Sequence, residues 1–307
     1  MMKEVMKNKK YIAGGERLTW AINDNQMDNI GFITGTAADV IDTGTQRNMT
    51  NAEIDWKYLT AGFSITLDEL NRTADSPYAV SSLVTEKLKN MEGSLSEFIA
   101  AALFASASGS PNAFNGFADI FAASGTAYAG LTDTDLGNDA AGDPLWLPQI
   151  DTTTNVVSYA NISPVITKLK TKKSTLAPGG SLDYMISNSA TLSKFKTSQQ
   201  GQQRFYAAKD LMSGFDGINV DGVVWYADDH AQGSGAGSTD NFLYFINSKS
   251  MQFGYRYGFD GKKSPLDRKG YNLPNQPVMN DNRYITGNIM CLDRRVNGVM
   301  KALNPSA

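Results

Sequence analysis

The chain has 307 residues, of which 41% are hydrophobic and 19% are charged, so it is long enough to bury a substantial core. Its formal net charge of −3 at pH 7 argues against a dedicated nucleic-acid binder, whose domain is usually basic. Cys291 is the only cysteine, which excludes an intramolecular disulfide and a thiolate zinc site within one chain.

The first 35 residues show no sustained apolar period. Scattered apolar side chains such as Trp20 and Phe32 stand among Asn, Asp and Gly. Such a stretch cannot bury itself, so residues 1–35 are predicted to form an arm laid over other structure. The lysines before Tyr11 do not begin a signal peptide, because no long apolar run follows them. We therefore expect neither export nor a membrane partner.

Residues 36–75 are more strand-like. Ile54, Trp56 and Tyr58 alternate with polar neighbours, and residues 48–51 are predicted to form a loop tip. The segment therefore predicts a long, thin hairpin with little hydrophobic cover of its own. Isolated two-stranded hairpins are marginal in water, so this hairpin is expected to lean on a neighbour.

A long amphipathic helix is predicted from Ser76-Pro77 to about residue 107. Serine is a good N-cap, and the missing N–H of proline is harmless in the first turn. Gly93 is expected to mark a bend or a close packing contact, because glycine in a helix costs about 1 kcal/mol relative to alanine. The apolar stripe consists of Val80, Val84, Leu88, Met91, Leu95, Phe98 and Ala102.

The region after this helix is acidic and rich in turns. Residues 90–167 carry eight carboxylates and no Lys or Arg, and residues 108–148 are predicted to be loops and short strands. A second helix is predicted to begin at Ser163-Pro164 and to end at Pro178.

The rest of the chain is predicted to be mainly strands. The clearest alternation of apolar and polar residues lies in 251–259. Without a regular βαβ repeat, the class is α+β. The predicted strands are 182–187, 218–226, 242–246, 251–259, 284–292 and 296–303, with a short helix at 190–197.

Nothing in the sequence assembles an active site. The single histidine, His230, stands in a polar, Gly-rich segment and is interpreted as a solvated loop residue. Asp133, Asp135, Asn138 and Asp139 lack the spacing of a calcium loop, so a flexible acidic loop is expected, with weak divalent-ion binding left open. We predict no enzyme activity, no metal and no cofactor.

The order of these elements resembles that of the major capsid proteins of tailed DNA phages, which have the Hong Kong 97-type fold. The resemblance covers nearly the whole chain and rests on several short sequence motifs. These are Phe63 to Leu70 leading into the long helix, Phe114-Asn115-Gly116-Phe117, Tyr128-Ala129-Gly130-Leu131, Leu145-Trp146-Leu147-Pro148 and Arg294 to Val299.

The resemblance implies four parts. Residues 1–35 would be the N-arm and 36–75 an extended E-loop hairpin. Residues 76–177 and 286–307 would form the P-domain with its spine helix at about 76–107, and 178–285 the A-domain.

The resemblance also implies a function and partners. The chain would assemble into hexamers and pentamers of an icosahedral head that encloses double-stranded DNA without sequence-specific binding. A scaffolding protein, a portal and possible decoration proteins would be its partners, with assembly in the host cytoplasm and residence in the virion. An encapsulin-type nanocompartment shell and a surface or adhesin protein stay open as alternatives.

Candidate contacts between subunits are named from charge and position. Some relatives form a covalent bond between an E-loop lysine and an asparagine of a neighbouring subunit. Lys57 and Asn297 are the candidates for such a bond in this sequence, but a non-covalent shell is expected here. The candidate contact residues are Arg47, Glu53, Asp55, Trp56, Lys57, Arg294 and Arg295.

Overall fold

The computed structural model divides into two compact units. The first unit comprises residues 1–18, 55–119 and 252–290, and the second comprises residues 19–54, 120–251 and 291–307. The residues described are 8–23, 32, 44, 49–73, 77–108, 110–138, 142–171, 182–199, 217–231, 241–265, 267–272 and 278–304.

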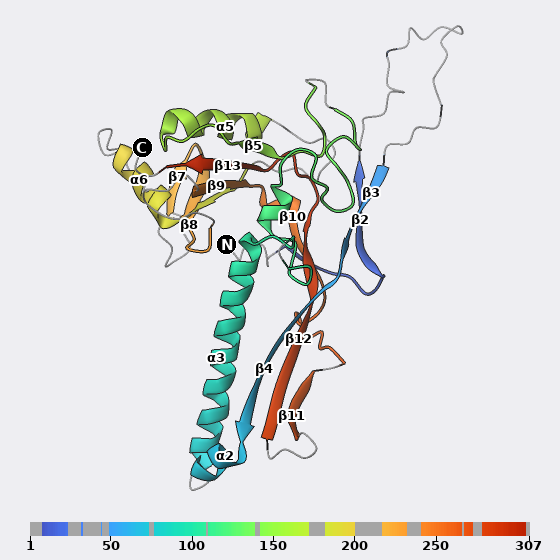
Figure 1. The fold of residues 1–307 in the computed structure, drawn as a ribbon, viewed down its shortest axis with the longest axis vertical. Coiled ribbons are helices and arrows are strands. Elements are labelled where there is room, and N and C mark those ends of the chain that lie inside the picture. Colours follow the sequence, from blue (N-terminus) through green and yellow to red (C-terminus); the bar gives the residue numbers. More distant parts are fainter. Residues whose placement is uncertain are drawn as a thin grey trace. The chain divides into compact units, whose positions relative to one another are not determined.

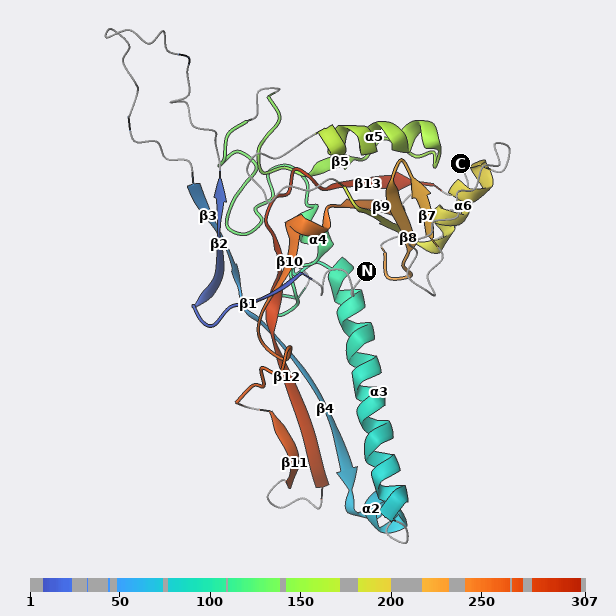
Figure 2. The ribbon, with the colours of Figure 1, turned by 180° about the vertical axis from the view of Figure 1, so that it is seen from behind.

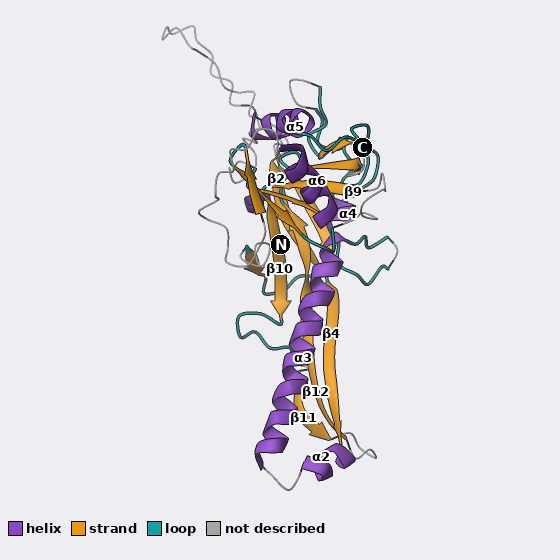
Figure 3. Cartoon of the chain, turned by 90° about the vertical axis from the view of Figure 1, so that its left-hand side faces the viewer, coloured by secondary structure: helices purple, strands orange, loops and turns teal. Residues whose placement is uncertain are grey.

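The first unit is a long helix on a mixed sheet (Figure 1). The strand order is β1-β10-β12-β11, and β4 also pairs with β12, antiparallel from Lys57 opposite Gly287 to Thr66 opposite Val278. Helix α3 runs alongside β4 and β12 (Figure 3). The elements are β1 (Lys9–Tyr11), β4 (Lys57–Thr66), α2 (Leu67–Thr73), α3 (Pro77–Phe104), β10 (Met251–Tyr257), β11 (Arg268–Asn272) and β12 (Val278–Cys291).

Helix α3 confirms the predicted long helix, although it ends at Phe104, a few residues early. Its proposed cap, Ser76, lies outside the described residues. The Phe104 ring packs edge-to-face on Phe117, with centroids 5.3 Å apart. No described helix, α3 included, is long and apolar enough to cross a membrane.

Gly93 inside α3 and Gly116 after it differ in how much space surrounds them. A Cβ on Gly93 would meet nothing within 4 Å, so the expected close packing contact is wrong. A Cβ on Gly116 would lie 2.7 Å from the carbonyl oxygens of Ala102 and Leu103. Gly116 therefore lets the following chain pass directly against the C-terminal carbonyls of the helix.

The second unit is built on a six-stranded sheet of order β5-β13-β9-β6-β8-β7 (Figure 2). Helices α5 and α6 contribute to one buried cluster on this sheet, in which Phe195 packs on Trp225 with ring centroids 4.9 Å apart. The elements are α4 (Phe117–Ile120, of which only Ile120 belongs to this unit), β5 (Gln149–Asp151), α5 (Tyr159–Thr171), β6 (Tyr184–Ser187), α6 (Ser189–Gln199), β7 (Gly217–Val220), β8 (Val223–Ala227), β9 (Asn241–Ile246), η2 (Ser248–Ser250) and β13 (Gly298–Leu303).

Two local predictions in this unit are wrong. The single strand predicted at 218–226 is the hairpin β7–β8, because Asp221 and Gly222 adopt φ of +52° and +79° and turn the chain. Helix α5 begins at Tyr159 and contains Pro164, because the Ser158 carbonyl already accepts the Ile162 N–H at 3.1 Å. The predicted helix end at residue 178 lies outside the described residues.

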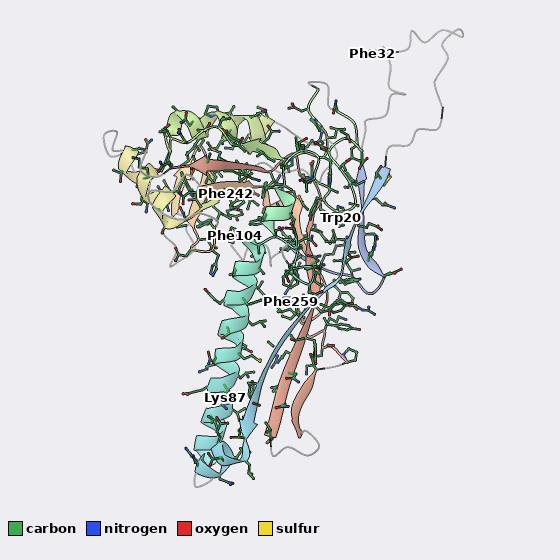
Figure 4. The ribbon with its side chains drawn as sticks, in the orientation of Figure 1. Trp20, Phe32, Lys87, Phe104, Phe242 and Phe259 are labelled. Atoms are coloured by element: carbon green, nitrogen blue, oxygen red, sulfur yellow. The ribbon has the colours of Figure 1, made fainter. Side chains whose placement is uncertain are left out.

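The N-terminal segment is more ordered than predicted. Strand β2 (Arg17–Asn23) pairs with β3 (Met49–Asp55), so the supposed arm and hairpin share one two-stranded sheet, and residues 49–51 are strand and not a loop tip. Within it, Trp20 and Ile54 are buried (Trp20 is labelled in Figure 4). The Glu53 N–H donates to the Ala129 carbonyl at 3.0 Å. The expectation that this region lacks cover within the chain is therefore wrong for its described part.

Alanine at the two glycines should have opposite effects on stability. We expect Gly93→Ala to raise the free energy of unfolding by about 0.5–1 kcal/mol, because it removes glycine from an uncrowded helix position. Gly116→Ala should lower it by about 1–3 kcal/mol, because the new methyl group overlaps helix carbonyls. Urea unfolding of both variants checks this, and equal shifts would contradict it.

Candidate functional site

Exposed large apolar side chains occur on both units, and those of the first unit lie mainly along β4, α2, α3 and β12. A groove of about 620 Å³ runs between β4 and α3, and Phe63, Met91 and Phe98 are among its lining residues. Single exposed apolar side chains are normal, whereas a continuous apolar patch or groove marks an interaction site. The exposed ones on β4, α2, α3 and β12 are Tyr58 (70%), Leu67 (51%), Val84 (38%), Phe98 (58%) and Met279 (38%).

The corner between β4, α2 and α3 is fixed by polar contacts. Glu69 accepts the Thr66 N–H at 3.0 Å while the Thr66 hydroxyl accepts the Glu69 N–H at 3.3 Å, which is a reciprocal capping box. Lys87 of α3, labelled in Figure 4, donates to both Glu69 carboxylate oxygens at 2.8 Å and to the Ser64 carbonyl at 3.0 Å. The Lys87 hydrogen bond holds the pKa of Glu69 below its ordinary value.

Asn288 joins distant segments inside the first unit. Its buried amide donates to the Asp55 carbonyl at 2.9 Å and to Asn115 Oδ1 at 2.8 Å, and its own Oδ1 accepts the Asn115 N–H at 2.9 Å. Sequence reasoning missed it, because a lone Asn in a strand gives no signal that it will be buried and bridging.

The predicted role of Arg294 as a contact between subunits is wrong. Its side chain is fully buried in the second unit. Its Nε donates to the Ile120 carbonyl at 2.9 Å and its Nη1 to the Trp146 carbonyl at 3.0 Å. The guanidinium also lies 5.4 Å from the centroid of the Tyr128 ring. Arg294 therefore fixes the loops of the second unit and offers no surface to a neighbour.

Asn297 is also fully buried and cannot reach a neighbouring subunit in this fold. Its Nδ2 donates to the Asp293 carbonyl at 2.7 Å and to Ser250 Oγ at 2.8 Å, and its Oδ1 accepts the Asn247 N–H at 2.8 Å. Lys57, the other residue of the considered cross-link, donates to the Pro111 carbonyl. Both side chains thus have partners within the chain.

The remaining predicted contact residues differ in exposure. Asp55 stays on the surface and pairs with Arg17 at 3.1 Å. Trp56 is buried and donates to the Gly15 carbonyl at 3.0 Å, while Arg295 is mostly buried beside Asp293, 3.6 Å away. Glu53 is half-buried on β3, and Arg47 lies outside the described residues.

The acidic region is organised by hydrogen bonds within each turn. Asp133 is buried and accepts the Ser124 hydroxyl and the Gly125 N–H, and Asp135 accepts the Thr132 N–H at 2.6 Å. Asp133 is thus fixed in place, contrary to the expected flexible loop, while Asp139 lies outside the described residues. His230 contacts its near neighbour Asp228 at 3.2 Å.

Across the described residues, no group of three or more His, Cys, Asp or Glu side chains could hold a metal ion. The described structure brings together no set of nucleophile, base and oxyanion donors around His230 either. The features that stand out are instead a rigid corner, an exposed apolar groove and an unusually long helix. These are features of an interaction surface.

The fold is the Hong Kong 97-type capsid fold, as the resemblance implied. The capsid chain of cyanophage A-1(L) is similar with a TM-score of 0.71 and 15% identity, covering 98% of this chain and 92% of that one. The capsid of a native GTA particle is similar with a TM-score of 0.62 and 13% identity, covering 97% and 89%.

An encapsulin has the same architecture. The SrpI encapsulin from Synechococcus elongatus PCC 7942 is similar with a TM-score of 0.56 and 9% identity, covering 98% of this chain and 87% of its own. No protein-family model matches the sequence, and no curated protein matches it.

Removing the Arg294 side chain should destabilise the second unit. Arg294→Met leaves the Ile120 and Trp146 carbonyls without their donors, so we expect the free energy of unfolding to fall by about 2–5 kcal/mol. Arg72→Met is the control, because Arg72 is exposed and pairs only locally with Asp68. Urea unfolding that ranks the two variants equally would overturn this role for Arg294.

Asp133 should make the free energy of unfolding depend on pH. The Ser124 hydroxyl holds the pKa of Asp133 below its ordinary value of 3.8, so its stabilising contribution is present above that pH and is lost as the pH falls through the folded-state pKa. Ser124→Ala should therefore lower stability at pH 7 but not in strong acid. Urea titrations of both proteins at the two pH values measure the difference, and a pH-independent difference would contradict the assignment.

Proposed function

We propose that this chain is the coat subunit of an icosahedral phage head, which it builds as hexamers and pentamers around double-stranded DNA. The observation that carries the proposal is a fold shared with a cyanophage capsid chain over 98% of this chain and 92% of that one. The exposed apolar side chains of the first unit support it, because burial between subunits would remove them from water.

The four domain assignments form part of the proposal: N-arm 1–35, E-loop 36–75, P-domain 76–177 with 286–307, and A-domain 178–285. Sheet pairing crosses these borders repeatedly, for example where β4 of the proposed E-loop pairs with β12. Strand β2 of the proposed arm pairs with β3 of the proposed E-loop, and β13 of the proposed P-domain pairs with β9 of the proposed A-domain. The borders therefore describe regions of sequence that share sheets.

The partners follow from the shell role. A separate scaffolding protein, a portal and decoration proteins would contact the assembled subunits, and DNA would be enclosed without sequence-specific binding. A net charge of −3 supports weak contact with phosphate. The protein would be assembled in the host cytoplasm, would reside in the virion and would have no catalytic role. Among the predicted contact residues, Asp55 supports a surface role best, because its side chain is 64% exposed.

A second candidate is an encapsulin-type shell, which the similarity to the SrpI encapsulin favours. Both functions use the same fold and differ in what the shell encloses. Particles purified from the native source would contain DNA under the first proposal and cargo protein under the second.

Purified protein should assemble through the apolar groove of the first unit. We expect the parent chain to form capsomers, shells or tubes, and Phe98→Glu to prevent this, because a carboxylate would replace a 58% exposed ring that burial should stabilise by about 1.5–3 kcal/mol. Negative-stain microscopy and sedimentation measure the particles, and circular dichroism verifies the fold.

Lys89→Glu is the matched control on the same helix, since Lys89 is exposed and does not line the groove. It should leave assembly intact. A parent chain that stays monomeric at high concentration would contradict the coat-subunit proposal. Normal shells from Phe98→Glu would show that the groove is not an interface. Denaturing electrophoresis of the shells should give a single band near 33.3 kDa, because the shell is expected to be non-covalent.

A further inference from the structure

A second cavity lies on the first unit next to the groove, with which it shares the lining residues Met91 and Leu95. It has a volume of about 430 Å³ and is formed by α3, the turn after β10, and β12. Its interior is apolar, with Met91, Leu95, Ile99, Phe259 and Ile285 among the lining residues. A cavity of this size and composition can hold one large apolar side chain and its flanking backbone.

Three cations and two carboxylates line this cavity, and the Lys262 ammonium lies 4.7 Å from the centroid of the Tyr11 ring. Lys262, Lys263 and Arg283 line it, and no ion pair involves any of them among the described residues. Of the two acids that line it, Asp267 already accepts the Ser264 N–H at 3.1 Å and the Tyr284 N–H at 2.8 Å. Both carboxylates keep their negative charge, so the lining has an excess of one positive charge, and Lys263 and Arg283 are the cations left to meet a ligand.

The wall of the cavity is pre-formed. Gly258 has φ of +100° and its N–H donates to the Lys262 carbonyl at 2.8 Å, which closes the turn after β10. The turn is held to the sheet by Asp260, which accepts the Tyr255 hydroxyl at 2.6 Å and pairs with Lys9. Phe259, labelled in Figure 4, packs edge-to-face on Phe253 and Tyr255. Binding would therefore require little reorganisation of this wall.

We propose that this cavity, which we name the α3–turn pocket, binds a segment of a different protein that carries a large apolar side chain flanked by carboxylates. The apolar side chain would fill the interior, and the carboxylates would pair with Lys263 and Arg283. Charge complementarity favours this occupant over a basic segment, and the apolar interior favours it over a nucleic acid, whose backbone has no group to fill the space.

The exposed corner at Leu67 of a second copy of this chain fits the pocket less well. Its exposed Leu67 is followed by Asp68, but that carboxylate is already paired with Arg72 at 3.0 Å, so the local surface is not acidic. The proposal goes beyond shell formation, and it is tested on unassembled protein. A failure to bind would therefore leave the coat-protein proposal untouched.

The test measures fluorescence anisotropy of a labelled peptide, Glu-Glu-Leu-Phe-Glu-Glu, against unassembled protein at low salt. Two comparison peptides replace the glutamates with lysine or the Leu-Phe pair with Ser-Ser, and a short DNA duplex serves as a plain polyanion. We expect the parent protein to bind the first peptide and to bind each of the other three probes at least tenfold more weakly.

Matched variants locate the binding. Ser96→Phe should fill the pocket and reduce affinity at least tenfold, whereas Ser94→Phe on the same helix lines the other groove and should change affinity less than twofold. Lys263→Gln and Arg283→Gln should each weaken binding by about threefold, and Lys89→Gln should not. The two charge variants keep the test valid even where Ser96→Phe folds poorly.

Each other outcome overturns the proposal. No binding of the acidic apolar peptide removes the site. Equal binding of the Ser-Ser peptide or of DNA means that only surface charge acts. Dimerisation of the parent that Ser96→Phe abolishes and the peptide cannot compete with would assign the pocket to a second copy of the chain.

Discussion

The pairing of β4 with β12 is the constraint on which the first unit depends. Ten consecutive residues of each strand pair, although the two strands lie more than 200 positions apart in the sequence. A helix as long as α3 is not stabilised by its own hydrogen bonds alone, and it needs an apolar surface on which to lie. That surface exists only once β4 and β12 have met. The Thr66–Glu69 capping box then fixes the start of α2 at the end of β4, and Lys87 ties α3 to this corner.

Much of the chain lies in turns and loops, and buried polar side chains hold these segments in place. Arg294 and Asn297 in the second unit, and Asn288 in the first, each bond to backbone groups that no helix or strand would satisfy. Burying such groups is unfavourable unless every donor and acceptor is paired. These residues are thus internal supports of irregular backbone. Charge alone suggested a surface role for Arg294, because sequence does not reveal which cations meet several carbonyl groups.

Helix α3 borders two adjoining cavities of different chemistry, which share Met91 and Leu95. One is the groove with β4, which carries the exposed ring of Phe98, and the other is the α3–turn pocket with its lysine and arginine side chains. A helix that has partners on more than one side is expected to carry apolar residues on more than one face, so its apolar and polar faces are less sharply separated. Under the two proposals, contact with like subunits and contact with a second protein use adjoining surfaces of one helix.

The sequence by itself determined the α+β class, the long helix, the alternating strand at 251–257 and the resemblance to capsid proteins, because these depend on local periodicity and on the order of elements. It also placed the short helix near 190–197. Only the tertiary structure decided which segments are covered. Trp20 and Ile54 were expected to await a neighbour, yet their cover comes from within the chain, and the pairing of β2 with β3 joins two supposed domains. The physical reason is that burial and strand pairing depend on residues far apart in the sequence. A local residue pattern shows which face of a segment is apolar, but it does not show which other segment will cover that face.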